Sequence, residues 1–345
     1  MRRLLAAFSV VIAGCSSSPP SAPLPGPAPE LVIIRASGGG YAVLETRTGH
    51  LRASLPAGIL ALGLSDGGDV GEAYLISPAA AGGTGIARVA PDRSFALEPL
   101  ATQGGPAAAA ILAGAPGLSS FVGPPTVLTV LAADGRLFGY QHGSLLWSDS
   151  ASVGQQLAGV GDETLLLGPR GWQRVLLDTG GLGPVETAPG CLPGPLAIIA
   201  GQVVYDCVGR LSRGDVAVPA GRPIAFAAGG VEVLAFPNGE LWRVDGAGAR
   251  RTGSTSAWTV APVPSADGSL LYLPSASGID RVDAGSGNGR RLVGARGISS
   301  LALSRDANYL YALFGDSLHT YATGSGSDAG SVVAAGDLIL AVAGG

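Results

Sequence analysis

The sequence contains no lysine, and it is poor in histidine and in charge. All 21 basic residues are arginine, and charged residues make up 13% of the 345 positions. The absence of lysine excludes a lysine Schiff base and the lysine of a phosphate-binding loop. The three histidines, His50, His142 and His319, are far apart, and no two have metal-ligand spacing within one element. We therefore predict no metal site and no cofactor.

Long apolar runs and long basic runs are also missing. The apolar stretch from Leu4 to Ile12 is too short for a transmembrane helix, which needs about 20 residues. Arginines occur at most in pairs, and the formal net charge is −4 at pH 7. A chain with this balance has no electrostatic footprint for a polyanion, so we expect no nucleic-acid partner.

The segment 1–14 has the anatomy of a secretory signal, with Arg2 and Arg3 ahead of a short apolar stretch. It leads into Ala13-Gly14-Cys15, which resembles the lipobox of bacterial lipoproteins. The resemblance implies that the sulfur of Cys15 receives a diacylglycerol and that the chain is cut just before it. Two or more acyl chains hold a protein stably on a membrane. A plain signal peptide with an incidental Cys15 is the alternative.

The segment that starts at the cysteine, residues 15–30, is rich in serine and proline and has no apolar periodicity. This composition is typical of an extended tether that lifts a domain off the bilayer. Ser16 stands where an aspartate commonly marks inner-membrane retention in enterobacterial lipoproteins. We therefore expect an exported protein of the cell envelope, at the outer membrane or cell surface rather than the inner membrane.

The composition of the remaining residues, 31–345, favours an all-β domain. The chain has 56 glycines and 25 prolines, which excludes a helical bundle, while 47% hydrophobic residues argue against disorder. Cys191 and Cys207 enclose a loop of about 15 residues, and in an exported protein such a pair predicts a disulfide. Closing that loop would contribute about 3 kcal/mol. Metal ligation by the pair is the alternative.

An internal repeat is clearest in the last third of the chain. Ser265 and Ser304 are one repeat apart, and each is followed by Asp at +2 and Tyr at +7. We predict that a strand ends at each serine, a turn containing the aspartate reverses the chain, and a Leu-Tyr strand returns. Two more short β-rich runs follow each serine. Each unit of about 40 residues therefore predicts four antiparallel strands, as in a propeller blade.

The repeat is cut short at the C-terminus. One more step of the same length reaches Ala343, where the chain has only the first strand of a unit. Three strands without a first strand are predicted at the other end, in residues 31–36, 41–45 and 51–55. We infer that the C-terminal strand pairs with the N-terminal strands and closes a ring, which removes open sheet edges.

Further units begin near Ile59, Ala109, Gln155, Leu196 and Pro223. With the two serine units and the unit shared by the chain ends this gives eight blades, with seven as the alternative count. A pair of β-sandwiches is the competing architecture, but it does not account for the common spacing of the units. The Ser-x-Asp units resemble WD40-like, TolB-type blades. The segments Asp134–Phe138 and Asn238–Trp242 resemble quinoprotein-type blades. Both resemblances imply a β-propeller and carry no substrate with them.

No linear catalytic motif is present, so the sequence favours binding over catalysis. The anchor and tether suggest a scaffold that binds a protein or glycan partner, similar in outline to the propeller lipoprotein of the outer-membrane barrel-assembly machinery. The alternative is a lactonase-like or other propeller hydrolase, whose residues would converge from several blades. Carboxylates converging in the central channel would favour the enzyme. An apolar or arginine-lined patch on one rim would favour partner binding.

Overall fold

A computed structural model describes the chain from Glu30 to Gly344, with internal gaps. The described residues are 30–64, 70–78, 83–90, 94–104, 107–114, 126–141, 144–150, 156–160, 163–168, 171–186, 195–199, 202–205, 224–228, 231–245 and 248–344. Every regular element in these ranges is a β-strand. Within them, no helix has the length and apolar character needed to cross a bilayer.

The described strands form eight antiparallel sheets. The first three, in sheet order, are β29 (Leu338–Gly344), β1 (Glu30–Arg35), β2 (Tyr41–Glu45) and β3 (Leu51–Leu55); β4 (Ile59–Leu64), β5 (Val70–Pro78), β6 (Gly83–Ala90) and β7 (Ala96–Gly104); β8 (Ala107–Gly114), β9 (Thr126–Ala132), β10 (Arg136–Gln141) and β11 (Ser144–Ser150). The next two are β12 (Gln156–Val160), β13 (Glu163–Gly168) and β14 (Gly171–Arg174); β15 (Pro195–Ile199) and β16 (Gln202–Tyr205).

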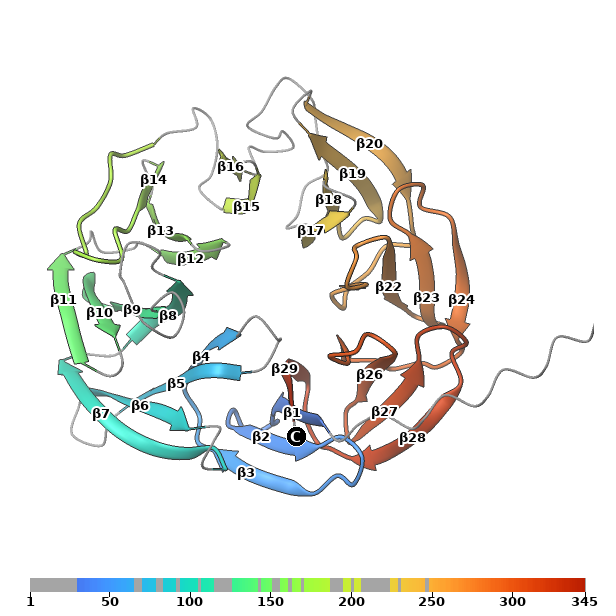
Figure 1. The fold of residues 1–345 in the computed structure, drawn as a ribbon, viewed down its shortest axis with the longest axis horizontal. Coiled ribbons are helices and arrows are strands. Elements are labelled where there is room, and N and C mark those ends of the chain that lie inside the picture. The colour runs from blue at the N-terminus through green and yellow to red at the C-terminus, as the bar shows by residue number, and fades with distance from the viewer. Residues whose placement is uncertain are drawn as a thin grey trace, which may run out of the picture.

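The last three sheets have four strands each. They are β17 (Ile224–Ala228), β18 (Val231–Ala235), β19 (Glu240–Asp245) and β20 (Gly248–Ser254); β21 (Val263–Pro264), β22 (Leu270–Ser275), β23 (Gly278–Asp283) and β24 (Gly289–Val293); β25 (Ser300–Leu303), β26 (Tyr309–Phe314), β27 (Ser317–Ala322) and β28 (Asp328–Val333). The sheets stand around a ring as the blades of a β-propeller (Figure 1). The predicted fold class is confirmed, and eight blades are seen among the described residues.

The repeated serine turns fold alike, as their common sequence pattern predicts. The hydroxyl of Ser265 donates to Asp267 (2.6 Å) and accepts the N–H of Leu270 (3.0 Å). Ser304 makes the same two contacts in the next blade, at 2.6 and 2.9 Å. Hydrogen bonds from Ser265 and Ser269 lower the pKa of Asp267 to about 2. The aspartate is therefore the ionised acceptor around which this turn is built.

The hydrophobic core lies between neighbouring blades rather than within any one of them. Apolar residues on the facing sides of two adjacent sheets, aliphatic and in most layers also aromatic, meet between the described blades. The layer between blades β17–β20 and β21–β24 contains Val233, Ala235, Leu241, Leu271, Leu273, Val282 and Ala284. A blade therefore buries its apolar faces only when both neighbours are present, as stacked sheets require.

The ring closes where the two ends of the described chain meet. Strand β29 pairs antiparallel with β1, with Val342 opposite Val32, so the sheet order is β29-β1-β2-β3 (Figure 1). This is the arrangement that the truncated last repeat predicts. In addition to the backbone pairing, the side chain of Arg35 donates two hydrogen bonds of 2.8 Å to the carboxylate of Asp337.

Strand β1 begins at Glu30, one residue earlier than the boundary that the sequence suggested. Glu30 is 6% exposed, and its carboxylate accepts hydrogen bonds from the hydroxyl of Tyr311 (2.7 Å) and the N–H of Arg305 (3.0 Å). Both donors belong to the preceding blade. Burial raises the pKa of Glu30, and burial together with the Glu30 contact raises the pKa of Tyr311. A residue assigned to the tether thus joins two blades.

We predict opposite effects of matched substitutions at the two serine turns. Ala307 has a φ of 58°, and Gly268 has a φ of 68° at the equivalent position. A left-handed conformation is costly for alanine and not for glycine. Ala307→Gly should therefore raise the free energy of unfolding by about 0.5–1 kcal/mol, and Gly268→Ala should lower it by a similar amount. Urea denaturation of both variants measures this. A loss of stability in Ala307→Gly would contradict the assignment.

A second prediction concerns Glu30. Glu30→Ala should lower the free energy of unfolding by about 1–3 kcal/mol, because Tyr311 and Arg305 lose their acceptor. Chemical denaturation at pH 7 measures this, and equal stability of Glu30→Ala and wild type would refute the role.

The same residue predicts a dependence on pH. Because folding raises the pKa of Glu30, its ionised form costs stability at neutral pH. This cost begins to fall once the pH drops below the folded pKa, and it is gone below the pKa of the unfolded chain. Wild type should therefore gain stability relative to Glu30→Gln, which does not titrate, as the pH falls from 7 toward 4. Denaturation of both proteins across this range measures the difference, and a loss by wild type would reverse the predicted sign.

Candidate functional site

Among the described residues, the strands at the centre of the ring contain no ionisable side chain. The innermost strands are β4, β8, β12, β15, β17, β21, β25 and β29 (Figure 1). Their residues are aliphatic, glycine, proline and phenylalanine, with one serine and one glutamine. In the described part of the chain, no three His, Cys, Asp or Glu side chains are grouped as metal ligands. The described channel strands are therefore apolar in composition.

Most residues singled out from the sequence lie elsewhere or outside the described residues. Cys15, Cys191, Cys207 and His142 fall outside them, so the lipid anchor and the disulfide stay predictions. His50 closes a turn at the start of β3.

His319 lies on β27. Its ring is stacked on Tyr321 with centroids 6.0 Å apart and meets the edge of Phe314 at 4.8 Å. Its Nδ1 lies 3.8 Å from a carboxylate oxygen of Asp328. These neighbours make it a packing residue between strands.

Four turns that follow the third strands of their blades share one geometry. In each, the N–H of the fifth residue, a glycine with φ of 69–76°, donates to the carbonyl of the first at 2.7–2.9 Å. The turns are Glu45–His50, Leu176–Gly181, Asp283–Asn288 and Ala322–Ser327. A Cβ on each glycine would collide with or press on the preceding blade, at Val332, Trp147, Ser254 and Leu292 respectively. The turn of one blade thus rests directly on the outer strand of the blade before it.

Arginine occupies the same third-strand position in three blades. Arg88, Arg243 and Arg281 each follow a β-bulge at the same spacing. Their cross-strand partners on the outer strands differ, because Arg88 faces Glu98, whereas Arg243 faces Arg250 and Arg281 faces Arg290. Like charges directly opposite each other destabilise a sheet. The Arg88–Glu98 pair shows that the fold is compatible with opposite charges at this position. The two Arg–Arg pairs are therefore specific to the sequences of their two blades.

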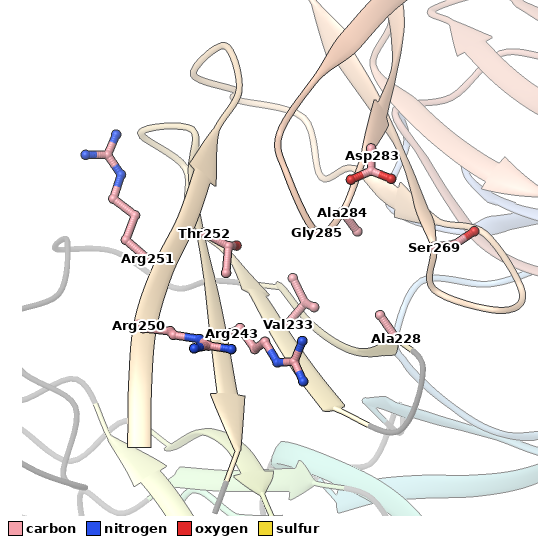
Figure 2. Close-up of a pocket in the computed structure, with 10 residues that line it drawn as sticks. All are labelled: Ala228, Val233, Arg243, Arg250, Arg251, Thr252, Ser269, Asp283, Ala284 and Gly285. Carbon is pink, nitrogen blue, oxygen red and sulfur yellow. The ribbon is translucent and has the colours of Figure 1, made fainter. Parts of the chain in front are cut away.

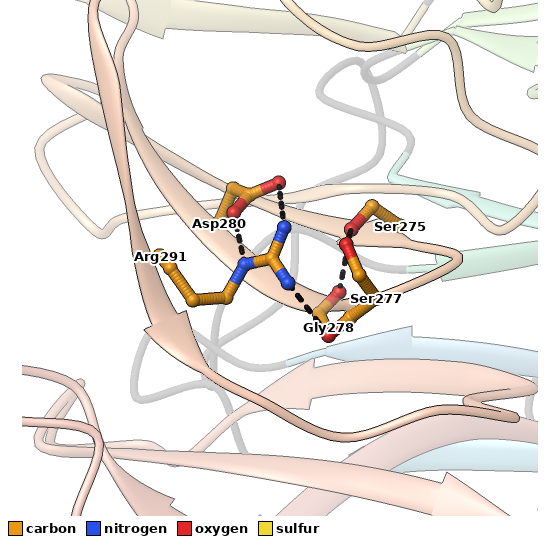
Figure 3. Close-up of polar contacts among 5 residues, drawn as sticks. All are labelled: Ser275, Ser277, Gly278, Asp280 and Arg291. Atoms are coloured by element: carbon orange, nitrogen blue, oxygen red, sulfur yellow. Dashed lines mark hydrogen bonds and ion pairs between the residues drawn. The ribbon is translucent and has the colours of Figure 1, made fainter.

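The second arginine of each outer-strand pair is held by an acidic residue on its own blade. Arg291 donates to the carboxylate of Asp280 (2.5 and 3.4 Å) and to the carbonyl of Ser277 (2.6 Å), as Figure 3 shows. In the preceding blade, Arg251 lies 3.8 Å from Glu240. Among the described residues, in contrast, no carboxylate pairs with Arg250, which is exposed. Arg250 is therefore available to a ligand.

A pocket of about 640 Å³ opens between blades β17–β20 and β21–β24. Its lining is Ala228, Val233, Arg243, Arg250, Arg251, Thr252, Ser269, Asp283, Ala284 and Gly285. Figure 2 shows the guanidinium groups of Arg243 and Arg250 side by side on one wall, with Asp283 on the opposite wall and Arg251 directed away. Val233 and Ala284 are buried members of the interblade core, so the floor is apolar.

Two other junctions among the described residues are bridged or have a smaller pocket. At the next junction, Arg281 donates to the carbonyl of Gly324 on the following blade (3.2 Å) and so joins the two blades. At the closing junction, a pocket of about 330 Å³ has Thr320 and Gly330 at the positions of the arginine pair. The pocket of Arg243 and Arg250 thus combines the larger volume with two neighbouring cations.

Sequence reasoning did not identify this site. The pairs Arg250-Arg251 and Arg290-Arg291 recur at nearly the same spacing as the serine turns, and this signal was visible as part of the repeat. The spacing of the pairs does not reveal that the first arginine of each pair faces another arginine. For Arg250, this cross-strand partner is known only from the register of β19 against β20, including its register shift.

The comparisons with known proteins support the fold alone. No protein-family model matches the chain, and neither does any curated sequence. Among solved structures, it is similar to the dihydro-heme d1 dehydrogenase NirN in complex with DHE (TM-score 0.60, 14% identity, 94% of this chain and 77% of that one). It is also similar to apo AztD from Citrobacter koseri (TM-score 0.57, 10% identity, 92% of this chain and 98% of that one). These are β-propeller proteins.

The likeness to BamB from Moraxella catarrhalis is looser, with a TM-score of 0.40 at 13% identity over 88% of each chain. An agreement at this level carries no functional argument. The similar structures therefore confirm a propeller and leave the ligand to be argued from the pocket itself.

We predict that Arg250→Glu stabilises the protein, since it would reproduce the opposite-charge pair of Arg88 and Glu98. The free energy of unfolding should rise by about 0.2–1 kcal/mol at low ionic strength. The gain should shrink in 1 M salt because the site is partly exposed. Glu98→Arg, which creates a like-charge pair, is the matched control and should lose stability. Denaturant titrations at both salt concentrations measure this, and an Arg250→Glu variant less stable than wild type at low salt would contradict it.

Proposed function

We propose that this chain is an exported, lipid-anchored protein of the cell envelope whose propeller binds a protein or glycan partner. The observation that carries the binding role is the arginine pocket between blades β17–β20 and β21–β24. It is a concavity of about 640 Å³, within the size range of small-ligand sites, and it holds two neighbouring cations above an apolar floor. Arginine is the residue best suited to bidentate recognition of a partner's oxyanions.

The proposed anchor explains how such a pocket would meet its partner. The serine- and proline-rich residues 16–29 separate Cys15 from β1, and in an extended polyproline form they would span about 40 Å. Glu30 is tied to Tyr311 and Arg305 of the adjoining blade, so the tether would pull on the closing seam rather than on a free end. The ring would be held near the membrane with both faces open to solvent.

The anchor predicts a clear change in fractionation. Wild type should sediment with the cell-envelope membranes, and Cys15→Ala should move to the soluble exported fraction, because the acyl chains would be lost. Immunoblots of both fractions measure this. A Cys15→Ala protein that still sediments with membranes would refute the lipid anchor.

The binding role is tested by cross-linking in intact cells, followed by purification of the full chain in detergent. Wild type and Arg290→Gln should retain the same cross-linked partner. The double variant Arg243→Gln with Arg250→Gln should lose it while remaining folded, which a thermal melt of the variant checks. Retention by the double variant would show that the pocket does not serve the partner, and absence of any specific cross-link to wild type would refute the function.

A further inference from the structure

The geometry of the arginine pocket points to an acidic sugar as its ligand. We infer that a carboxylate, sulfate or phosphate group on the sugar lies between the guanidinium groups of Arg243 and Arg250, with the ring over Val233. This inference deepens the proposed function, on which it rests, by naming the chemistry of the group that is recognised.

Charge gives the first step. Arg243 and Arg250 are direct cross-strand partners, and their guanidinium groups share one wall of the pocket (Figure 2). An oxyanion between them would accept charge-assisted hydrogen bonds from both. The carboxylate of Asp283 does not take this role. It accepts the N–H and the hydroxyl of Ser286 in its own turn, both at 2.8 Å.

The shape of the pocket gives the second step. On one side, the turn of the next blade rests on the preceding outer strand, where a Cβ at Gly253 would collide with the carbonyl of Ser286. Backbone from the two blades is therefore in direct contact beside the pocket, which fixes their spacing, while the arginine side chains form one wall. A bounded pocket of about 640 Å³ fits a compact ring better than an extended peptide, which needs a groove or an open sheet edge.

The lining gives the third step. The hydroxyl of Thr252 lies on the arginine side of the pocket and that of Ser269 on the facing blade, and the floor is formed by small aliphatic side chains (Figure 2). Thr252 donates to the carbonyl of Leu241 (3.4 Å) and Ser269 to Asp267 (2.8 Å), so both hydroxyl oxygens can still accept hydrogen bonds from the ring hydroxyls of a sugar, and the apolar floor suits its C–H face. An acidic peptide would use the cations but not these hydroxyls. The observations therefore favour the acidic sugar.

The test is calorimetric titration of the full chain in detergent at low salt. The probes are glucuronate, glucose 6-sulfate and glucose 6-phosphate, with glucose as the uncharged control and triglutamate as the acidic peptide. At least one acidic sugar should bind saturably with a dissociation constant of about 1 mM, as expected for a ligand of this size. Glucose should show no saturable binding, and the preferred probe identifies the oxyanion.

The variants separate the pocket from general surface charge. Arg250→Gln, at an exposed position, and Arg243→Gln should each weaken binding of the preferred sugar at least about tenfold, since each removes a charge-assisted contact. Arg290→Gln is the matched control, because it lies at the equivalent outer-strand position of the next blade and outside the pocket. It should leave the dissociation constant within about twofold. Thermal melts establish that each variant is folded.

Three results would overturn the inference: no saturable binding of any acidic sugar, an equal loss in Arg290→Gln, or tighter binding of triglutamate than of every acidic sugar. Its failure is distinguishable from failure of the proposed function. If the cross-linking experiment recovers a partner that requires Arg243 and Arg250 while acidic sugars do not bind, the sugar inference falls and the partner-binding function stands.

Discussion

The pairing of β29 with β1 is the contact on which the remaining structure depends. The apolar faces of each blade are buried only by its two neighbours, so a ring with a gap would leave two sheets facing water. The ladder between residues from the two ends of the chain supplies the missing neighbour. The ion pair of Arg35 with Asp337 and the buried carboxylate of Glu30 add side-chain contacts across the same seam.

Within the closed ring, the contact between a glycine turn and the outer strand of the preceding blade recurs, but the side chains beside this contact differ from one pair of blades to the next. A glycine turn of one blade rests on the outer strand of the preceding blade, against Trp147, Ser254, Leu292 or Val332. At Trp147 the indole fills the space and its Nε1 donates to the carbonyl of Leu177 (2.8 Å). The close approach of the glycine turn is common to these junctions, whereas the neighbouring side chains vary. Because the side chains can vary without loss of this contact, one junction can contain a pocket.

The charge pattern of that pocket runs against local stability, which is the usual mark of a site retained for binding. Arg88 with Glu98 shows that the fold accepts an opposite-charge pair at this position. Arg243 and Arg250 place two like charges opposite each other at this position, which under our inference would suit a bound anion. The second arginine of each outer-strand pair, one residue further along, is placed beside a carboxylate of its own blade. In these two blades the second arginine of the pair contacts a carboxylate of its own blade, whereas the first arginine is exposed to solvent.

The sequence by itself determined the fold class, the blade repeat and the closing strand. These follow from local patterns: the Ser-x-Asp turns at Ser265 and Ser304, the regular spacing of the units, and a last unit that stops after one strand. Tertiary structure alone decided the site. The opposition of Arg243 and Arg250 depends on the register shift between β19 and β20, where Thr252 is the extra residue on β20, and a shift of one residue in register would turn either side chain to the other face. The pocket also needs the next blade, whose turn at Asp283 supplies the facing wall. A contact between blades has no signature within either blade, and for that reason the linear pattern predicted the ring but not the pocket.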